Sequence, residues 1–353
     1  MGEGRRRGHN GGVADTPFDG TGRPSNRGEA LRPDGVWPGC GALSAGGAFV
    51  GPDDRVGPDV ARRVASALAS WWDGHARDFP WRFGRTTPWG VLVSEVMSQQ
   101  TPMSRVVPYW TAWMHEWPEP SALAAATSAE VITAWGRLGY PRRALRLREC
   151  AESICGRHGG RLPDSYEELV ALPGIGDYTA SAVMSFAFGR RIAVVDTNIR
   201  RVLSRVFLGE ESTGGAASRR ERDLAEDVLP RGAVDSVVWN QAVMELGAVV
   251  CTARTPGCED CPLAPFCAFL AAGRPGLGER RTRPRQRFEG TDRQVRGIVL
   301  RALREAGRDA SLSRVDLEGL WKDRTQLESC VASLDEDGLV EIGSDGSVRL
   351  PLS

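Results

Sequence analysis

The chain has 353 residues, of which 41% are hydrophobic and 25% charged, so it is long and apolar enough to bury cores for two or three domains. Its 45 basic residues are balanced by 45 acidic residues, and overall charge therefore does not identify a nucleic-acid partner. The longest apolar runs fall short of the roughly 20 residues that a membrane helix needs. No apolar segment follows the early RRR run as it would in a secretion signal, so we expect a cytoplasmic protein.

Residues 1–57 are rich in Gly, Arg and Pro and lack apolar periodicity, which predicts a disordered arm. From about Pro58 the pattern becomes helical, with apolar residues every four positions at Val60, Val64, Leu68 and Trp72. Pro88 precedes a second apolar helix, VLVSEVMSQQ.

Capping patterns and apolar periodicity predict the helices that follow. No alternating strand pattern of useful length occurs before residue 270, so the body over 58–268 is expected to be all-α. The expected helices are one opened by Thr127 and Glu130 and ended by Gly139, one opened by Asp164 and Glu167 and running through Leu172, and others near 177–188, 197–207, 219–229 and 235–249.

The composition changes after the helical body. Residues 269–290 contain AAGRPGLGERRTRPRQR, a Pro/Gly/Arg-rich stretch typical of a basic linker. Helices are then predicted over 291–306, 313–321 and 325–337. The run LVEIGSDGSVRL (339–350) has apolar alternation around Asp345-Gly346, which indicates a hairpin. Three helices and a terminal hairpin predict a small winged-helix-like domain over 291–353.

Four of the eight cysteines lie within seventeen residues, in the stretch CTARTPGCEDCPLAPFC (251–267). Four thiolates are a complete ligand set for a tetrahedral zinc ion or a cubane iron–sulfur cluster. Structural zinc sites usually contain two C-x2-C pairs, whereas this stretch has one such pair flanked by gaps of six and five residues. The spacing favours iron–sulfur, with Cys251, Cys258, Cys261 and Cys267 as the ligands.

The remaining candidates for functional residues are one glycine-containing turn and two carboxylates. In LPGIGDYTA (172–180), Gly174 and Gly176 allow a tight turn whose N–H groups suit a phosphate, although most such turns simply join helices. Asp196, in VVDTNIRRVL, is a good N-cap for the helix that follows it. Glu95 has apolar neighbours that should raise its pKa; a glutamate in such a helix is otherwise usually partly exposed or ion-paired.

These motifs together resemble the endonuclease III and MutY branch of the helix–hairpin–helix DNA glycosylases over residues 58–268. The hairpin LPGIGDYTA, the cysteine spacing and the stretch WGVLVSEVMSQQT, which is similar to the MutY signature, occur in the family's order. The resemblance implies a two-lobed helix–hairpin–helix fold with a [4Fe–4S] loop and duplex DNA as partner. It also allows for a monovalent cation at the hairpin.

The resemblance further implies that the chain is a MutY-type adenine DNA glycosylase that acts in base excision repair. Glu95 would protonate the adenine and Asp196 would stabilise the positive sugar, on adenine mispaired with 8-oxoguanine or guanine. Tyr178 and Asn198 match family residues that orient this site. The residues implied to contact DNA are Arg82, Gln100, Thr101, Tyr140, Gly174 and Gly176.

Lysine content bears on the expected reaction. Bifunctional family members use a hairpin lysine, where this chain has Tyr178, and the chain's one lysine is Lys322. We therefore expect hydrolysis of the N-glycosidic bond, which releases the base, without lysine-dependent lyase activity. We also expect a monomer that associates with the nucleoid.

The chain also departs from the family. Ser98 and Thr197 differ from the usual residues of their motifs, and the segment after residue 288 lacks the glutamate-rich box of the Nudix-like domain that recognises 8-oxoguanine in many MutY proteins. The alternatives are a glycosylase of this fold that removes thymine or uracil opposite guanine, and a metal-containing DNA-binding regulator. The arginines at 142, 143, 146 and 148, like those in 280–287, could either be solvated or meet phosphates.

Overall fold

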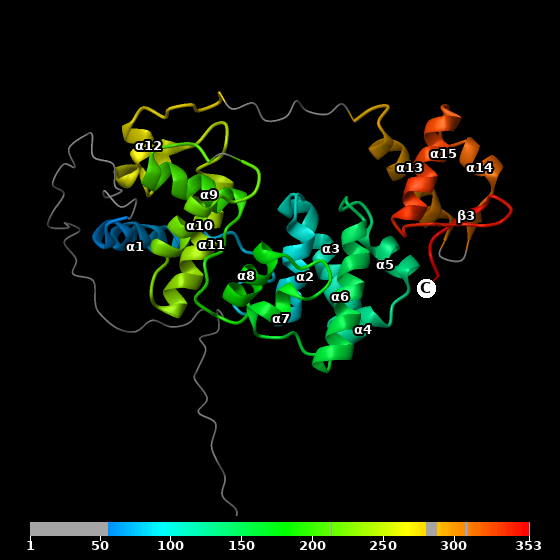
Figure 1. The fold of residues 1–353 in the computed structure, drawn as a ribbon, viewed down its shortest axis with the longest axis horizontal. Coiled ribbons are helices and arrows are strands. Elements are labelled where there is room, and N and C mark those ends of the chain that lie inside the picture. Colours follow the sequence, from blue (N-terminus) through cyan, green and yellow to red (C-terminus); the bar gives the residue numbers. More distant parts are fainter. Residues whose placement is uncertain (1–55, 213, 280–287, 308–309, 353) are drawn as a thin grey trace, which may run out of the picture.

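The computed structural model describes residues 56–212, 214–279, 288–307 and 310–352 (Figure 1). Most of the predicted N-terminal arm and the basic run 280–287 therefore lie outside the described residues. No helix among the described residues combines the length and the apolar character that crossing a membrane would take.

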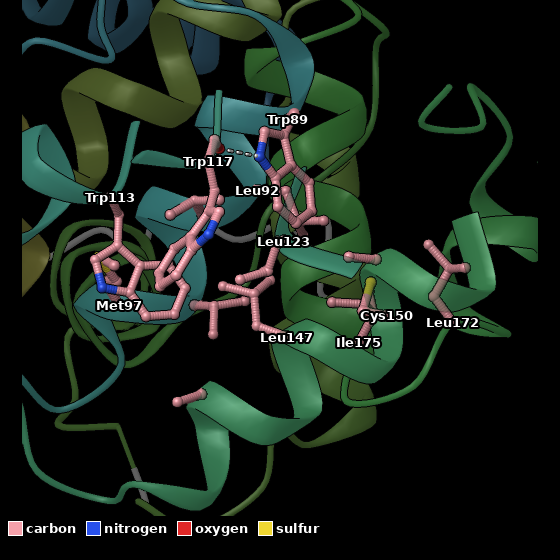
Figure 2. Packing of buried hydrophobic residues seen from close by; sticks show 14 of the residues in the cluster. Trp89, Leu92, Met97, Trp113, Trp117, Leu123, Leu147, Cys150, Leu172 and Ile175 are labelled. Carbon is pink, nitrogen blue, oxygen red and sulfur yellow. Dashed lines mark hydrogen bonds between the residues drawn. The ribbon is translucent and has the colours of Figure 1, made fainter. Parts of the chain in front are cut away.

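A first lobe of helices encloses a core that is rich in tryptophan. Figure 2 shows Trp89, Trp113 and Trp117 packed with aliphatic side chains, and the Trp89 indole N–H donates to the Trp117 carbonyl at 3.2 Å. Burial of such large apolar side chains is the main stabilising contribution here. The elements are α2 (Pro88–Ser98), α3 (Met103–Glu116), α4 (Pro120–Ala124), α5 (Ser128–Trp135), α6 (Arg142–His158), α7 (Tyr166–Val170) and α8 (Asp177–Phe186).

A second lobe has its own core and combines the start of the described chain with residues that follow α8. The predicted apolar stripe of the first helix is buried at Val64, Leu68 and Trp72. The elements are α1 (Pro58–His75), α9 (Thr197–Leu203), the π-helical turn η1 (Ser204–Leu208), α10 (Arg219–Asp227), α11 (Ala233–Val249), the 3₁₀ turns η2 (Cys258–Asp260) and η3 (Ala264–Phe266), and α12 (Ala268–Ala271). The all-α prediction for the body is confirmed.

The two lobes meet at α8, one face of which packs in each core. Val183 and Met184 belong to the first core, whereas Ala182 belongs to the second and Tyr178 packs against it. A helix that is apolar on both faces can be buried between two layers. Side chains that leave α8 near its start therefore lie at the junction of the lobes.

The C-terminal residues form three helices and a small sheet with the strand order β1-β3-β2, all antiparallel. The predicted hairpin is present as the β2–β3 pair, and β1, which was not predicted, adds a third strand. The elements are α13 (Asp292–Ala306), β1 (Ser311–Leu312), α14 (Arg314–Glu318), α15 (Arg324–Glu336), β2 (Glu341–Ile342) and β3 (Val348–Arg349). We call residues 288–352 the C-terminal unit; its extent as a separate domain remains a prediction.

Several helix boundaries differ from those predicted. The capping box of Thr127 and Glu130 forms as expected, but α5 ends at Gly136, which has φ 52°, rather than at Gly139. Ser165, not Asp164, caps α7, because its hydroxyl accepts from the Glu168 N–H. Helices α3, α4 and α6 were not predicted, and the helix expected over 197–207 changes to π-helical geometry after Leu203.

Candidate active site

Glu95 lies on α2 with only 8% of its surface exposed. Burial raises the pKa of its carboxyl group to about 7, because the charged form loses hydration. The Asp196 carboxylate adds to the rise, while the Tyr178 hydroxyl and the Arg82 charge oppose it. The sequence prediction of a raised pKa is confirmed, and Glu95 can hold a proton near neutral pH.

Tyr178 stands in the first turn of α8, directly after the hairpin. Its hydroxyl donates to Glu95 Oε2 at 2.7 Å. Burial and the two nearby carboxylates raise the pKa of the Tyr178 phenol well above its usual value, so the phenol stays neutral and remains a donor. Since Oε2 accepts this bond, the acidic proton of Glu95 belongs on Oε1.

Asp196 is the N-cap of α9, and its Oδ1 accepts from the Ile199 N–H at 2.6 Å. The Asn198 amide donates to Oδ2 at 3.2 Å. Burial dominates and raises the pKa of Asp196 above its usual value, and these N–H donors and the Arg201 charge limit the rise. Donors directed at a carboxylate favour its ionised form, so this group is suited to remain an anion beside a neutral Glu95.

Close packing of α9 against α11 holds Asp196 in place. A Cβ atom at Gly247 would lie 2.8 Å from Asn198 Cβ and 3.0 Å from the Asn198 carbonyl oxygen, so only glycine fits. Arg201 joins the two helices, because its Nη2 donates to Asn198 Oδ1 at 2.7 Å and to the Gly247 carbonyl at 2.6 Å.

A cavity of about 160 Å³ opens between the lobes, and all four predicted catalytic residues line it. Six of its sixteen lining residues have aromatic or thioether side chains, which suit the flat face of a base, and half of the lining is polar or charged. The lining residues are Arg77, Phe79, Trp81, Arg82, Val91, Glu95, Ser98, Met103, Tyr178, Phe186, Asp196, Asn198, Gln241, Met244, Glu245 and Ala248.

Glu245 is a buried member of this wall that the sequence reasoning missed. Its carboxylate pairs with Arg82 at 2.8 Å and with Arg77 at 2.5 Å, and the bonds from these two arginines lower its pKa. Arg82 is thereby buried in the cavity wall rather than lying on the surface. An acidic residue within the apolar helix WNQAVMELG is the same signal that singled out Glu95.

Gln100 and Tyr140, two of the residues implied to contact DNA, are exposed, and their backbones are left-handed with φ 55° and 48°. Such conformations are costly for residues other than glycine. Arg143 holds in place the two loops that carry Gln100 and Tyr140. It donates five hydrogen bonds, to the carbonyls of residues 96, 97, 99 and 139 and to the Thr101 hydroxyl. Thr101 is itself buried, so it serves the loop structure.

The two glycines of the predicted hairpin differ in backbone conformation. Gly174 has φ 75°, and a Cβ there would approach Arg146 Cβ to 2.9 Å, whereas Gly176 has an extended backbone and open space around it. The arginines near Tyr140 divide into two kinds. Arg143 and Arg148 donate to backbone carbonyls, whereas the side chains of Arg142 and Arg146 are 57% and 52% exposed.

The four clustered cysteines line one small, apolar cavity behind α11. Burial, together with the neighbouring cysteines, raises the pKa of Cys261 to about 11, and the Arg205 guanidinium donates to Cys251 Sγ at 3.3 Å. In the described part of the chain, no three ligating side chains converge closely enough to hold a single metal ion. The four thiols on one cavity wall are nevertheless a complete donor set for a thiolate-bound cluster or for a tetrahedral zinc ion.

The chain is similar to known proteins in both sequence and fold. The family model of the HhH-GPD superfamily of base excision DNA repair proteins matches residues 93–227. An adenine DNA glycosylase of Mycolicibacterium smegmatis is 47% identical over 285 residues, which cover 80% of this chain and 94% of that protein. This alignment is longer than residues 58–268, so the similarity extends beyond the predicted range.

Solved structures agree with the fold. A thermostable thymine-DNA glycosylase superposes with a TM-score of 0.55 at 29% identity, covering 60% of this chain and 96% of that one. Endonuclease III in a non-covalent complex with DNA has a TM-score of 0.53 at 21% identity, covering 62% of this chain and 98% of that one, and shows the fold alone. The two-lobed helix–hairpin–helix prediction is thereby confirmed.

Proposed function

Because the chain belongs to the adenine DNA glycosylase family, within the superfamily of helix–hairpin–helix base excision repair proteins, we propose that it hydrolyses the N-glycosidic bond of adenine mispaired with 8-oxoguanine or guanine. The observation that carries the proposal is the pair of carboxyl groups, Glu95 and Asp196, that line one cavity. Glu95 has a pKa of about 7, while Asp196 accepts N–H donors that favour its charge.

The division of labour follows from these environments. Protonated Glu95 gives its proton to N7 of an extruded adenine, which makes the base a better leaving group. The C1′–N9 bond breaks, and the Asp196 carboxylate stabilises the positive sugar. Water then adds to C1′, and the proton that it loses restores the Glu95 acid. Aromatic walls and the Arg82–Glu245 pair supply the shape and the polar edge against which the base lies.

The reaction stops at the abasic site. The described residues that line the cavity include no lysine, and the chain's one lysine, Lys322, belongs to the C-terminal unit. Schiff-base cleavage of the strand needs a primary amine at the sugar. We therefore infer that the enzyme is monofunctional. We further propose that it acts as a monomer on chromosomal DNA in the cytoplasm.

The four cysteines are proposed to hold a [4Fe–4S] cluster. Support comes from the complete thiolate set lining one cavity and from its apolar walls. In this position the cluster would pin the loop 251–267 against η1 and α11. The chemistry it supplies when bound is structural and electrostatic, and base excision is assigned to the cavity between the lobes.

Removal of thymine or uracil is the competing activity, because a thymine-DNA glycosylase shares this fold. Pyrimidines offer no N7 for Glu95 to protonate, so the site favours adenine. The test is single-turnover excision on duplexes with A opposite 8-oxoguanine, G, C and T, and with T or U opposite G. Adenine release opposite 8-oxoguanine and G is expected; excision confined to T or U opposite G would refute the proposal.

A further inference from the structure

The C-terminal unit is docked on the first lobe through a shared core. Ala129 and Ile132 of α5 are buried together with Val295, Val299 and other residues of the unit. Figure 1 shows α13 on the side of the unit that faces the glycosylase helices. Because burial of this kind favours one arrangement, the residues at the start of α13 are held in a defined position.

Polar contacts fix the same arrangement. The Arg304 guanidinium on α13 donates to the Ile132 carbonyl at 3.2 Å. Asp337 pairs with Arg142 of α6 at 3.1 Å and with Arg296 of α13 at 2.5 Å, so one carboxylate joins the lobe and the unit. These contacts bring the start of α13 next to the loop that precedes α6.

At that point Arg293 stacks on Tyr140. Its guanidinium carbon lies 5.3 Å from the centre of the Tyr140 ring, and that of Arg143 lies 5.7 Å from the same ring. Tyr140 is 48% exposed, and Arg293 is exposed as well. Among the described residues, no carboxylate lies within ion-pair distance of Arg293. Neighbouring Asp292 already accepts from the Gln326 amide at 2.8 Å.

The charge of the unit determines what kind of contact it can make. Residues 288–353 include nine arginine or lysine residues against thirteen aspartate or glutamate residues. A surface of net negative charge cannot attract DNA broadly, because binding to the phosphate backbone depends on cationic side chains. General affinity of the C-terminal unit for DNA is therefore disfavoured, and any contact of the unit with DNA must be local.

We propose that Arg293 extends the DNA-binding surface beyond the two lobes by pairing with a phosphate of the duplex next to Tyr140. The inference rests on the proposed function, since DNA reaches this place only if Tyr140 faces the substrate. Stacking on the ring positions the guanidinium without consuming its charge. The C-terminal unit thus contributes one positively charged side chain, held in a defined position, to the DNA interface.

The test measures binding of the full chain to a duplex that carries a tetrahydrofuran abasic-site analogue opposite 8-oxoguanine. Dissociation constants are recorded by fluorescence anisotropy over a range of KCl concentrations. One phosphate contact contributes about 0.9 to the slope of log K against log salt. Arg293→Gln should weaken binding and reduce that slope by about this amount, Arg293→Glu should weaken binding further, and Arg293→Lys should retain most of the slope.

Arg301 supplies the matched control. It is an exposed arginine about two turns further along the same helix than Arg293, and its Nε lies 4.0 Å from a Glu305 carboxylate oxygen. Arg301→Gln should leave both affinity and slope unchanged. An unaltered slope in Arg293→Gln would overturn the inference, even if its affinity falls through disturbance of Tyr140. Absence of adenine excision by the wild-type protein would instead refute the proposed function, so the two failures can be told apart.

Discussion

The hydrogen bond from Tyr178 to Glu95 allows a quantitative test of the proposed acid. At 2.7 Å it stabilises the carboxylate form and holds the pKa of Glu95 at about 7, below the value that burial alone would give. A hydrogen bond to a charged group contributes about 1.5–3 kcal/mol. Since one pKa unit corresponds to about 1.4 kcal/mol, Tyr178→Phe should raise the pKa of Glu95 by about 1–2 units.

The assay is the pH dependence of single-turnover adenine excision. The acid must be protonated to act, so the wild-type rate should be highest below pH 7 and should fall about tenfold per pH unit above it. In Tyr178→Phe the midpoint of this decline should move upward, to about pH 8–9 by the shift just derived. The variant would then lose less of its own maximal rate at alkaline pH than the wild-type protein does.

Tyr166 provides a matched control on the same hairpin. Its hydroxyl donates to Asp177 at 2.5 Å, away from the lining of the cavity, and Tyr166→Phe should leave the midpoint unchanged. Glu95→Gln should lower the rate by about 10²–10⁴-fold and abolish the alkaline decline. A Tyr178→Phe midpoint at or below that of the wild type would refute the assignment of Glu95 as the acid.

Two further predictions concern stability. Gly247→Ala should destabilise the protein by about 1–3 kcal/mol and slow excision, because the new Cβ would clash with the backbone of Asn198; Gly156→Ala, with open space in mid-helix, should stabilise it by up to about 1 kcal/mol. Thermal unfolding of both variants, followed by circular dichroism, measures this contrast. The raised pKa of Glu95 gives stability that is fully present below about pH 4.5 and lost as pH rises through about 7, roughly 3 kcal/mol in total. Glu95→Gln should therefore gain melting temperature relative to wild type between pH 5 and 8, and parallel curves would contradict the burial argument.

Sequence patterns predicted those parts of the fold that depend on local chemistry. Three examples are the apolar stripe on α1, the capping box at Thr127 and the N-cap at Asp196. Each depends only on residues within one or two turns of a helix. Helix α6 was not predicted, although the apolar residues that it buries, such as Leu147, Ala151 and Ile154, have helical spacing; its tertiary contacts could not be foreseen. In the structure Arg143 and Arg148 are engaged with backbone carbonyls of neighbouring loops. Such long-range partners leave no local signal in the sequence.

The candidate site likewise combines residues that the sequence predicted with tertiary contacts that it did not. Glu95 and Asp196 were identified through apolar surroundings, capping and resemblance, and the structure brings them to one cavity. Glu245 stands in an apolar helix as Glu95 does, but its pairing with Arg82 could not be derived, since it joins residues 163 positions apart. The approach of Gly247 to Asn198 likewise depends on how two helices pack. Such contacts follow from tertiary packing rather than from any local pattern.

The cysteine loop and the reacting carboxylate are physically linked through Arg201. Its Nε donates to the Cys251 carbonyl at 2.8 Å, while its Nη2 donates to Asn198 Oδ1 at 2.7 Å. Asn198 in turn donates to Asp196. Arg201 is buried, so each acceptor that it lost would leave an unsatisfied donor at a cost of about 1–3 kcal/mol. A rigid loop at 251–267 therefore limits the movement of Asp196 by way of this arginine, which gives the proposed cluster a role in the geometry of excision without any part in its chemistry.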